Sequence, residues 1–202
     1  MRPLKAYIDL SALTFNLKLV KKIAKNSKVM AVLKANAYGH GLIESVKAIK
    51  SAEGIAILTI EEAVKIRKAG FKNTILLLEG LFAAEDIHQA EKLNLNIVVH
   101  NDQQMDYLSD VKLKNPINVH LKINTGMNRL GFPPDQVDYL IENLNANPNV
   151  SDVTLMTHFA TADEKEGITK QLDCFNRVTN NYNFSSSVAN SAALYKFPEA
   201  RL

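Results

Sequence analysis

Four side chains suited to chemistry stand at or just after the end of strand-like hydrophobic runs: Lys34, Lys122, Arg129 and His158. A lysine that loses water at such a place has its pKa lowered, which makes the amine a useful nucleophile or base. An arginine presents a planar fork of donors that suits a carboxylate or a phenolate. These residue types therefore favour nucleophilic or acid–base chemistry.

Lys34 directly follows the hydrophobic run of residues 29–33. Alternation along this run predicts that Met30, Val32 and Lys34 share one face, so we expect the lysine to lie among buried neighbours. The alternative is a lysine that merely ends the strand and extends into water. These few residues do not separate the two interpretations.

Lys122 shares the inward face of a predicted strand with His120 and Asn124. An inward lysine needs an anionic partner or a covalent change that removes its positive charge. Arg129 follows in a Gly-bounded turn, where it can bind a carboxylate or phenolate or form a structural salt bridge.

His158 ends another predicted strand on the same face as Met156. A neutral imidazole there can stack on a flat cofactor ring, act as an acid or base, or sit in the core with its hydrogen bonds satisfied. Asn190 and Ser191 begin a small-residue run whose hydroxyl and backbone amides can seat a phosphate, although such runs also form plain turns. The five histidines, at 40, 88, 100, 120 and 158, show no ligand spacing, so we expect no metal site.

Composition narrows the class of protein. The 24 basic and 21 acidic residues give a formal charge of +3 and form no basic stripe, so we expect no nucleic-acid partner. There is no run of about 18 apolar residues and no signal-peptide core, so we expect no membrane association. The single cysteine, Cys174, fits a reducing compartment, which predicts a cytoplasmic protein. Dinucleotide, P-loop and serine-hydrolase motifs are absent from the sequence.

Strand-like runs alternate with helical patterns along most of the chain. Strands are expected over residues 29–33, 55–59, 74–78, 96–100, 117–123, 153–158 and 185–189. Helices are expected over residues 42–52, 60–69, 84–93, 102–108, 134–144 and 168–182. Ahead of these units, residues 6–10 predict a short strand, and Ser11 predicts the cap of a first helix.

This alternation predicts parallel strands with helical crossovers, either in an open doubly wound sheet or in a closed (β/α)8 barrel. An open sheet gathers its functional side chains at one switch point, whereas a barrel draws them from the ends of many strands. Reactive or polar residues end several of the runs, so we expect the barrel. The seven runs are one short of closure, which predicts a TIM-type α/β barrel truncated after its seventh strand.

Four stretches, in family order, resemble alanine racemases, which are fold type III enzymes that use pyridoxal phosphate: VLKANAYGHG (32–41), HLKINTGMNRLGF (120–132), THFATAD (157–163) and ANSAA (189–193). Residues 6–10 and 76–80 show a weaker likeness. The resemblance spans the chain and implies that residues 1–202 are the cofactor-binding barrel domain, without the family's last barrel strand and C-terminal β domain. It also implies that a strand within residues 1–10 associates with that C-terminal domain.

The resemblance implies a role for each matching residue, with Lys34, Arg129 and His158 as the catalytic set. Lys34 matches the lysine that binds the cofactor covalently and exchanges the α-proton on the D side. Arg129 matches the guanidinium that contacts the cofactor's phenolic oxygen and the substrate carboxylate, and His158 matches the imidazole beside the cofactor ring. Further cofactor-binding positions are Tyr38, Leu78, Asn190 and Ser191.

Lys122 matches a lysine that the family often carries as a carbamate, an anion that would pair with Arg129. The family's second base, a tyrosine from another subunit, has no counterpart in these 202 residues. The resemblance therefore implies a homodimer in the full-length form and an inactive chain alone.

Three functions fit these expectations. The first is an alanine racemase, which interconverts L- and D-alanine by two-base proton transfer. The second is a catalytically incomplete barrel that binds pyridoxal phosphate without turnover. The third is a cofactor-free Schiff-base aldolase, which the phosphate-binding positions at Tyr38 and Ser191 disfavour.

Overall fold

The computed structural model describes residues 4–201 and contains a sheet of seven parallel strands that pair in sequence order. Every strand is followed by at least one helix, which is the arrangement that parallel pairing requires because the chain must return to the same end of the sheet. The strands are β1 (Met30–Val32), β2 (Gly54–Ile57), β3 (Thr74–Leu77), β4 (Asn96–Val99), β5 (Ile117–Lys122), β6 (Val150–Met156) and β7 (Ser185–Ser187).

Four of the described helices begin at a side-chain cap. Asp9 accepts hydrogen bonds from two amides at the start of α1, and Thr59, Asn101 and Asn190 cap α4, α6 and α9 in the same way. None of the described helices is long and apolar enough to cross a membrane. The helices are α1 (Leu10–Ala24), α2 (Lys34–Tyr38), α3 (Leu42–Ala48), α4 (Ile60–Lys68), α5 (Asp86–Lys92), α6 (Asp102–Ser109), α7 (Val137–Ala146), α8 (Thr169–Thr179) and α9 (Ser191–Lys196), with 3₁₀ turns η1 (Pro134–Gln136) and η2 (Pro198–Ala200).

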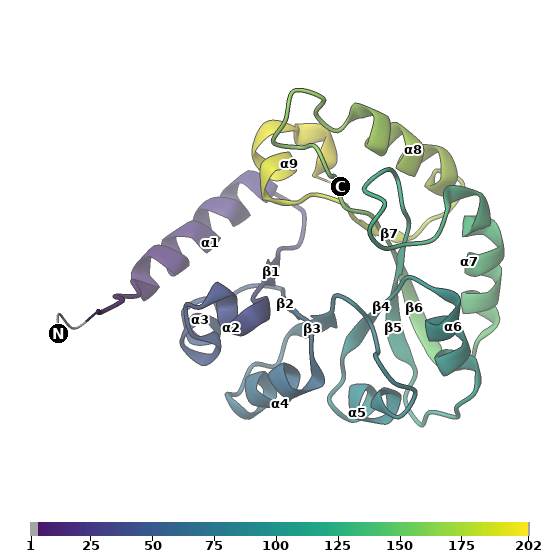
Figure 1. Cartoon of the computed structure of the whole chain (residues 1–202), viewed down its shortest axis with the longest axis horizontal. Coiled ribbons are helices and arrows are strands. Elements are labelled where there is room, and N and C mark those ends of the chain that lie inside the picture. The colour runs from purple at the N-terminus through teal and green to yellow at the C-terminus, as the bar shows by residue number, and fades with distance from the viewer. Residues whose placement is uncertain (1–3, 202) are drawn as a thin grey trace.

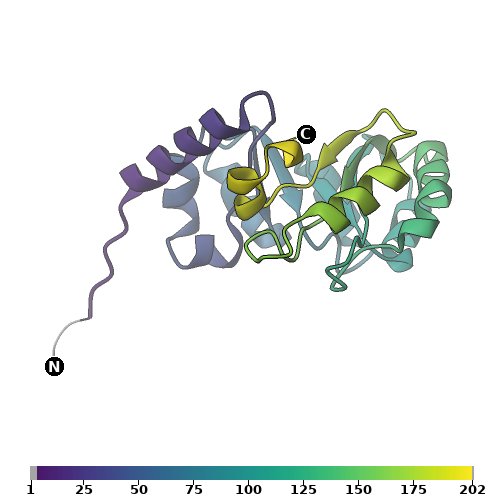
Figure 2. The same ribbon diagram turned by 90° about the horizontal axis from the view of Figure 1, so that it is seen from above.

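The sheet curves into an arc that is open within residues 4–201, since β1 and β7 are its two edges. Helices α3 to α8 follow the outer side of this arc (Figure 1). Helix α9 contacts α1, so the last helix lies against the first (Figures 1 and 2). Because all the strands run the same way, the residues that follow them gather at one end of the arc.

Two apolar clusters hold the arc together. The larger cluster joins the sheet to the helices and contains the fully buried residues Ile55, Ile75 and Ile97. The smaller cluster lies on the opposite, inner face and consists of Ala56, Leu76 and Val98 with Met30, Leu78 and Met156 packed against them. Alternate residues of the same strands therefore supply the two cores, as the period of two along a strand requires.

The predicted seven-stranded, barrel-type α/β fold is confirmed, with three local corrections. Residues 4–9 form no strand, because this part of the chain extends away from the sheet and has no strand to pair with (Figure 2); residues 1–3 of the proposed N-terminal strand lie outside the described residues. The cap of α1 is Asp9 and not Ser11, whose amide donates to the Asp9 carboxylate at 2.9 Å. Strand β1 ends at Val32, so Lys34 is not part of it.

One inner-face residue of β5 is polar and deeply buried. His120 is only 6% exposed, and among the described residues its Nδ1 has no hydrogen-bond partner. Burial lowers the pKa of this imidazole from 6.5 to about 4, and the nearby Asp152 carboxylate opposes the shift only partly. The neutral ring is therefore the form that the folded chain accommodates.

We expect His120 to make the chain less stable as the pH falls from about 6.5 to about 4, because the unfolded chain binds the proton in this range and the folded chain does not. The lowered pKa corresponds to about 3 kcal/mol of unfolding free energy, fully present above pH 6.5. Urea unfolding at pH 7 and at pH 4.5 should show that His120→Leu loses less unfolding free energy between the two pH values than the wild type does. The matched change at the exposed His88, His88→Leu, should alter the pH dependence far less, because His88 has only the smallest of the effects on the pKa of Glu91. Equal losses of unfolding free energy in all three proteins would contradict the assignment.

Candidate active site

The segment after β1 is a left-handed helical turn. Ala35, Asn36, Ala37 and Tyr38 all have φ between 52° and 55°. For residues with a Cβ this conformation costs about 1–2 kcal/mol each, because the Cβ approaches the following carbonyl oxygen. Strain of this kind persists only where the surrounding structure enforces it.

Several contacts hold the left-handed turn in place. The buried Ala37 donates its amide to the Leu33 carbonyl at 2.9 Å, and the Asn36 side chain accepts the Leu42 amide at 2.9 Å. Outside the turn, the Glu62 carboxylate accepts the Leu58 amide at 3.1 Å and faces the Asn36 amide at 3.5 Å. The turn is thereby tied to the start of α3 and to the segment after β2.

The left-handed turn sets the positions of its two ends, Lys34 and Tyr38. Lys34 is half-buried, whereas Tyr38 is 59% exposed. The expectation that Lys34 shares a face with buried neighbours was wrong in part: Met30 is half-buried, but Val32 is 39% exposed. The reason is that β1 is an edge of the sheet in the described residues, so its side chains have neighbours on one side only.

A second segment, residues 122–132, forms a closed loop at the end of β5. The Phe132 amide donates to the Lys122 carbonyl and the Asn124 amide donates to the Phe132 carbonyl, both at 2.9 Å. Gly131, with φ of 115°, makes the closure possible, because a Cβ there would lie 2.9 Å from the Asn124 nitrogen. Arg129 is therefore carried on a loop whose two ends are fastened together.

The interior of this loop is organised by the Asn124 side chain. Its Oδ1 accepts the amides of Gly126 at 3.1 Å and Asn128 at 3.0 Å, and its Nδ2 donates to Asn128 Oδ1 at 3.0 Å. These bonds hold Asn128 at a φ of 58°, directly before Arg129. The backbone that carries the guanidinium is thus set by local hydrogen bonds, although the Arg129 side chain itself is exposed.

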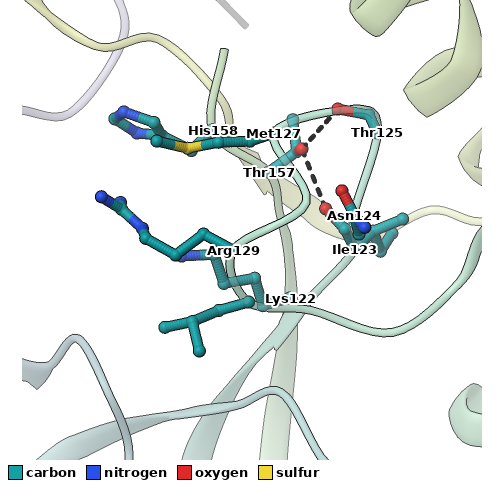
Figure 3. A pocket seen from close by; sticks show the side chains of 9 residues that line it. Lys122, Ile123, Asn124, Thr125, Met127, Arg129, Thr157 and His158 are labelled. Carbon is teal, nitrogen blue, oxygen red and sulfur yellow. Dashed lines mark hydrogen bonds between the residues drawn. The ribbon is translucent and has the colours of Figure 1, made fainter. Parts of the chain in front are cut away.

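The segment after β6 lies against this loop. Thr157 Oγ1 donates to the Ile123 carbonyl at 2.9 Å and lies 2.7 Å from Thr125 Oγ1. Figure 3 shows that the side chains of Arg129 and His158 extend in the same direction from these two neighbouring segments. Lys122, Arg129 and His158 line one pocket at the carboxyl ends of β5 and β6.

The site is strongly positive. Lys122 is buried, and its pKa is lowered first by that burial and then by Arg129 and Lys34, against an opposing effect of Glu79. The pKa of His158 is lowered by burial and then by the same three cations, Lys122, Arg129 and Lys34. The imidazole is therefore neutral at neutral pH. Lys34, Lys122 and Arg129 act on the same region, where the negative charge of Glu79 offsets part of their positive charge. Such an arrangement suits a ligand that carries more than one negative charge.

The other predicted site residues lie nearby but do not line this pocket. Leu78 follows β3 and packs in the inner cluster, and Tyr38 ends the left-handed turn. Asn190 caps α9 through the Ala193 amide and donates to the Phe159 carbonyl at 3.0 Å, which places the start of α9 beside the residue after His158. Ser191 is exposed in the first turn of α9.

The sequence analysis assigned no role to four residues that shape this site: Thr125, Thr157, Gln171 and Glu62. A signal for the closed loop was present, because an asparagine two residues before a glycine favours a side-chain-to-backbone turn. No sequence pattern predicted the roles of Thr125, Thr157 and Gln171, since each of these side chains contacts a residue more than ten positions away in the sequence.

We expect Ala35→Gly to keep or raise the unfolding free energy, by up to about 1 kcal/mol, because glycine pays no left-handed penalty and loses only about 0.5–1 kcal/mol of backbone entropy. Ala12→Gly, at an exposed position in the right-handed α1, should instead lower it by about 0.5–1 kcal/mol. Urea unfolding of the two variants measures the difference. Equal destabilisation by both would show that the turn is not strained.

Comparison with known proteins agrees with the fold and with the family resemblance seen in the sequence. Residues 8–202 match the family model described as alanine racemase, N-terminal domain. An alanine racemase of Nitrosospira multiformis is 47% identical over an alignment that covers 98% of this chain and 57% of the relative. A catabolic alanine racemase of Klebsiella aerogenes is 42% identical over 98% of this chain and 56% of its own length.

The solved structures give the same result. The biosynthetic alanine racemase from Pseudomonas aeruginosa superposes with a TM-score of 0.94 at 40% identity, over 99% of this chain and 57% of that one. The chain thus spans a little more than half the length of the relatives it matches. It belongs to the alanine racemase N-terminal domain family.

Proposed function

We propose that this chain is the cofactor-binding barrel part of an alanine racemase, an isomerase that interconverts L- and D-alanine with pyridoxal phosphate. The observation that carries the proposal is the pocket that Lys122, Arg129 and His158 share, with Lys34 close enough for its charge to lower the pKa of the imidazole. Both the cofactor, with its phosphate and phenolate, and the substrate carboxylate are anionic, so this charge distribution fits them.

The chain offers a residue for each part of the cofactor. The half-buried amine of Lys34 would bind its aldehyde carbon covalently. Tyr38, Asn190 and Ser191 would bind the phosphate, and Leu78 would pack against the ring from the inner cluster. The hydrogen bond from Asn190 to the Phe159 carbonyl supports this arrangement, because it joins the phosphate end to the segment that carries His158.

Pyridoxal phosphate, when bound, delocalises the charge left on the α-carbon after its proton departs. Lys34 Nζ would accept or return that proton on one face of the α-carbon. Arg129 would bind the substrate carboxylate through two parallel hydrogen bonds, and His158 would lie against the cofactor ring. Racemisation also needs a base on the opposite face, which the family resemblance places in another subunit of a homodimer.

Lys122 presents a separate problem, since a buried cation beside Arg129 is unfavourable. Its lowered pKa favours the neutral amine, which is the form that reacts with carbon dioxide. Carbamate formation would add a carboxylate to Nζ and release one proton. The resulting anion would pair with Arg129 and fix the guanidinium, so we include a Lys122 carbamate in the proposal.

We expect pyridoxal phosphate to produce a new absorbance band at the edge of the visible range when it is added to the chain, because a covalent link to an amine extends the conjugation of the cofactor. Lys34→Ala should abolish this band. Lys47→Ala, which removes an exposed lysine on α3, should retain it. A band that survives in Lys34→Ala would contradict the role of Lys34.

A fused protein tests the reaction itself. Joining this chain at Leu202 to the remaining C-terminal part of the Nitrosospira multiformis relative supplies the portion of the relative that the chain does not match. We expect D-alanine to form from L-alanine with the fused protein and not with the chain alone, as measured by a D-amino-acid-specific assay. A second candidate function is a barrel that binds the cofactor without turnover. A fused protein that binds pyridoxal phosphate but forms no D-alanine would support that candidate instead.

A further inference from the structure

Three buried polar side chains hold the Arg129 loop and the segment that carries His158 in place: Thr125, Thr157 and Gln171, here called the clasp. They are 8%, 3% and 9% exposed. Thr125 belongs to the loop, Thr157 directly precedes His158, and Gln171 lies on α8. Buried polar groups are costly unless they are paired, so their hydrogen bonds show what the clasp connects.

The hydroxyl groups form a directed chain. Thr157 Oγ1 donates its single proton to the Ile123 carbonyl at 2.9 Å. The contact of 2.7 Å between the two hydroxyls must then use the Thr125 proton, with Thr157 Oγ1 as the acceptor. Successive hydrogen bonds of this kind strengthen one another. Together they favour a single position of the Arg129 loop relative to the segment that carries His158.

Gln171 fastens the segment that carries His158 to α8. Its Oε1 accepts the Ala160 amide at 2.8 Å, and its Nε2 donates to Thr161 Oγ1 at 2.9 Å. The Thr161 hydroxyl in turn donates to the Gly167 carbonyl at 2.7 Å, which fixes the orientation of the amide. Gly126 of the loop faces this side chain, since a Cβ added at Gly126 would lie 3.5 Å from Gln171 Cγ.

We infer that Thr125, Thr157 and Gln171 are positioning residues: the two threonines lock the Arg129 loop to the His158 segment, and Gln171 fixes that segment to α8. The backbone that carries the guanidinium and the backbone that carries the imidazole thus meet a ligand in one fixed relative placement. The identity of that ligand rests on the proposed function. The lock itself does not, because it is built from contacts within the chain. A fixed placement avoids the entropy that two independent loops would lose on binding.

The test uses the whole chain and two measurements. The first is the pKa of His158 in the ligand-free chain, followed by NMR of its ring protons; the charged groups that act on this imidazole are Lys122, Arg129 and Lys34. The second is the dissociation constant of pyridoxal phosphate. Thr157→Val removes the clasp hydroxyl without changing the shape of the side chain, and Thr157→Ser restores it. Thr154→Val makes the same change on β6, at a threonine whose hydroxyl has no hydrogen bond within residues 4–201.

We expect Thr157→Val to raise the pKa of His158 toward its ordinary value, because the loosened loop takes Arg129 away and admits water, and to weaken pyridoxal phosphate binding about tenfold. Gln171→Leu should act in the same direction. Thr157→Ser and Thr154→Val should match the wild type in both measurements. If Thr157→Val does not fold, Thr125→Val breaks the same hydroxyl contact while keeping the bond from Thr157 to Ile123.

The inference would be overturned if the His158 pKa stays unchanged both in the hydroxyl variant and in Gln171→Leu. The hydroxyl variant is Thr157→Val, or Thr125→Val if Thr157→Val does not fold. Lower melting temperatures alone would not support the inference, because a merely structural role lowers stability without moving this pKa. A wild-type chain that binds no pyridoxal phosphate, together with the expected pKa changes, would reject the proposed function and support the clasp. The two proposals can therefore fail separately.

Discussion

Parallel pairing of consecutive strands is the constraint on which the structure depends. Because β1 to β7 all run in one direction, the segments that follow them meet at one end of the arc, and residues as distant in sequence as Lys34 and His158 influence each other there. The two apolar clusters hold this geometry from both faces of the sheet. The topology of the sheet thus determines where the site lies, whatever side chains the segments carry.

The site places positive charge where water is scarce. Lys122 is buried, and its neighbours Arg129 and Lys34 lower its pKa further, which is an unfavourable arrangement for the chain by itself. An anionic ligand removes this cost, and a neutral His158 adds no further repulsion. The electrostatics therefore argue for anion binding independently of the family relationship.

Two devices hold the groups that would react. Lys34 and Tyr38 sit at the ends of a left-handed turn that the Asn36 side chain and a buried Ala37 stabilise. Arg129 sits on a loop closed between Lys122 and Phe132 and clasped to the His158 segment. In both cases the backbone is fastened by hydrogen bonds, while the side chains of Lys34, Tyr38 and Arg129 keep some access to solvent. Rigid backbone with accessible side chains is what a site for a flat, charged ligand requires.

The sequence by itself determined the seven-strand rhythm, the barrel-type fold and the motifs around Lys34, Lys122, Arg129 and His158, because apolar periodicity and Gly-bounded turns are local properties of the chain. Only the tertiary structure decided that β1 stops before Lys34, that residues 4–9 form no strand and that the lysine turn is left-handed. It also decided the clasp, since Thr157 and Gln171 act on segments that are remote in the sequence. These features depend on which segments pack together, and the periodicity within a single segment does not predict those tertiary contacts.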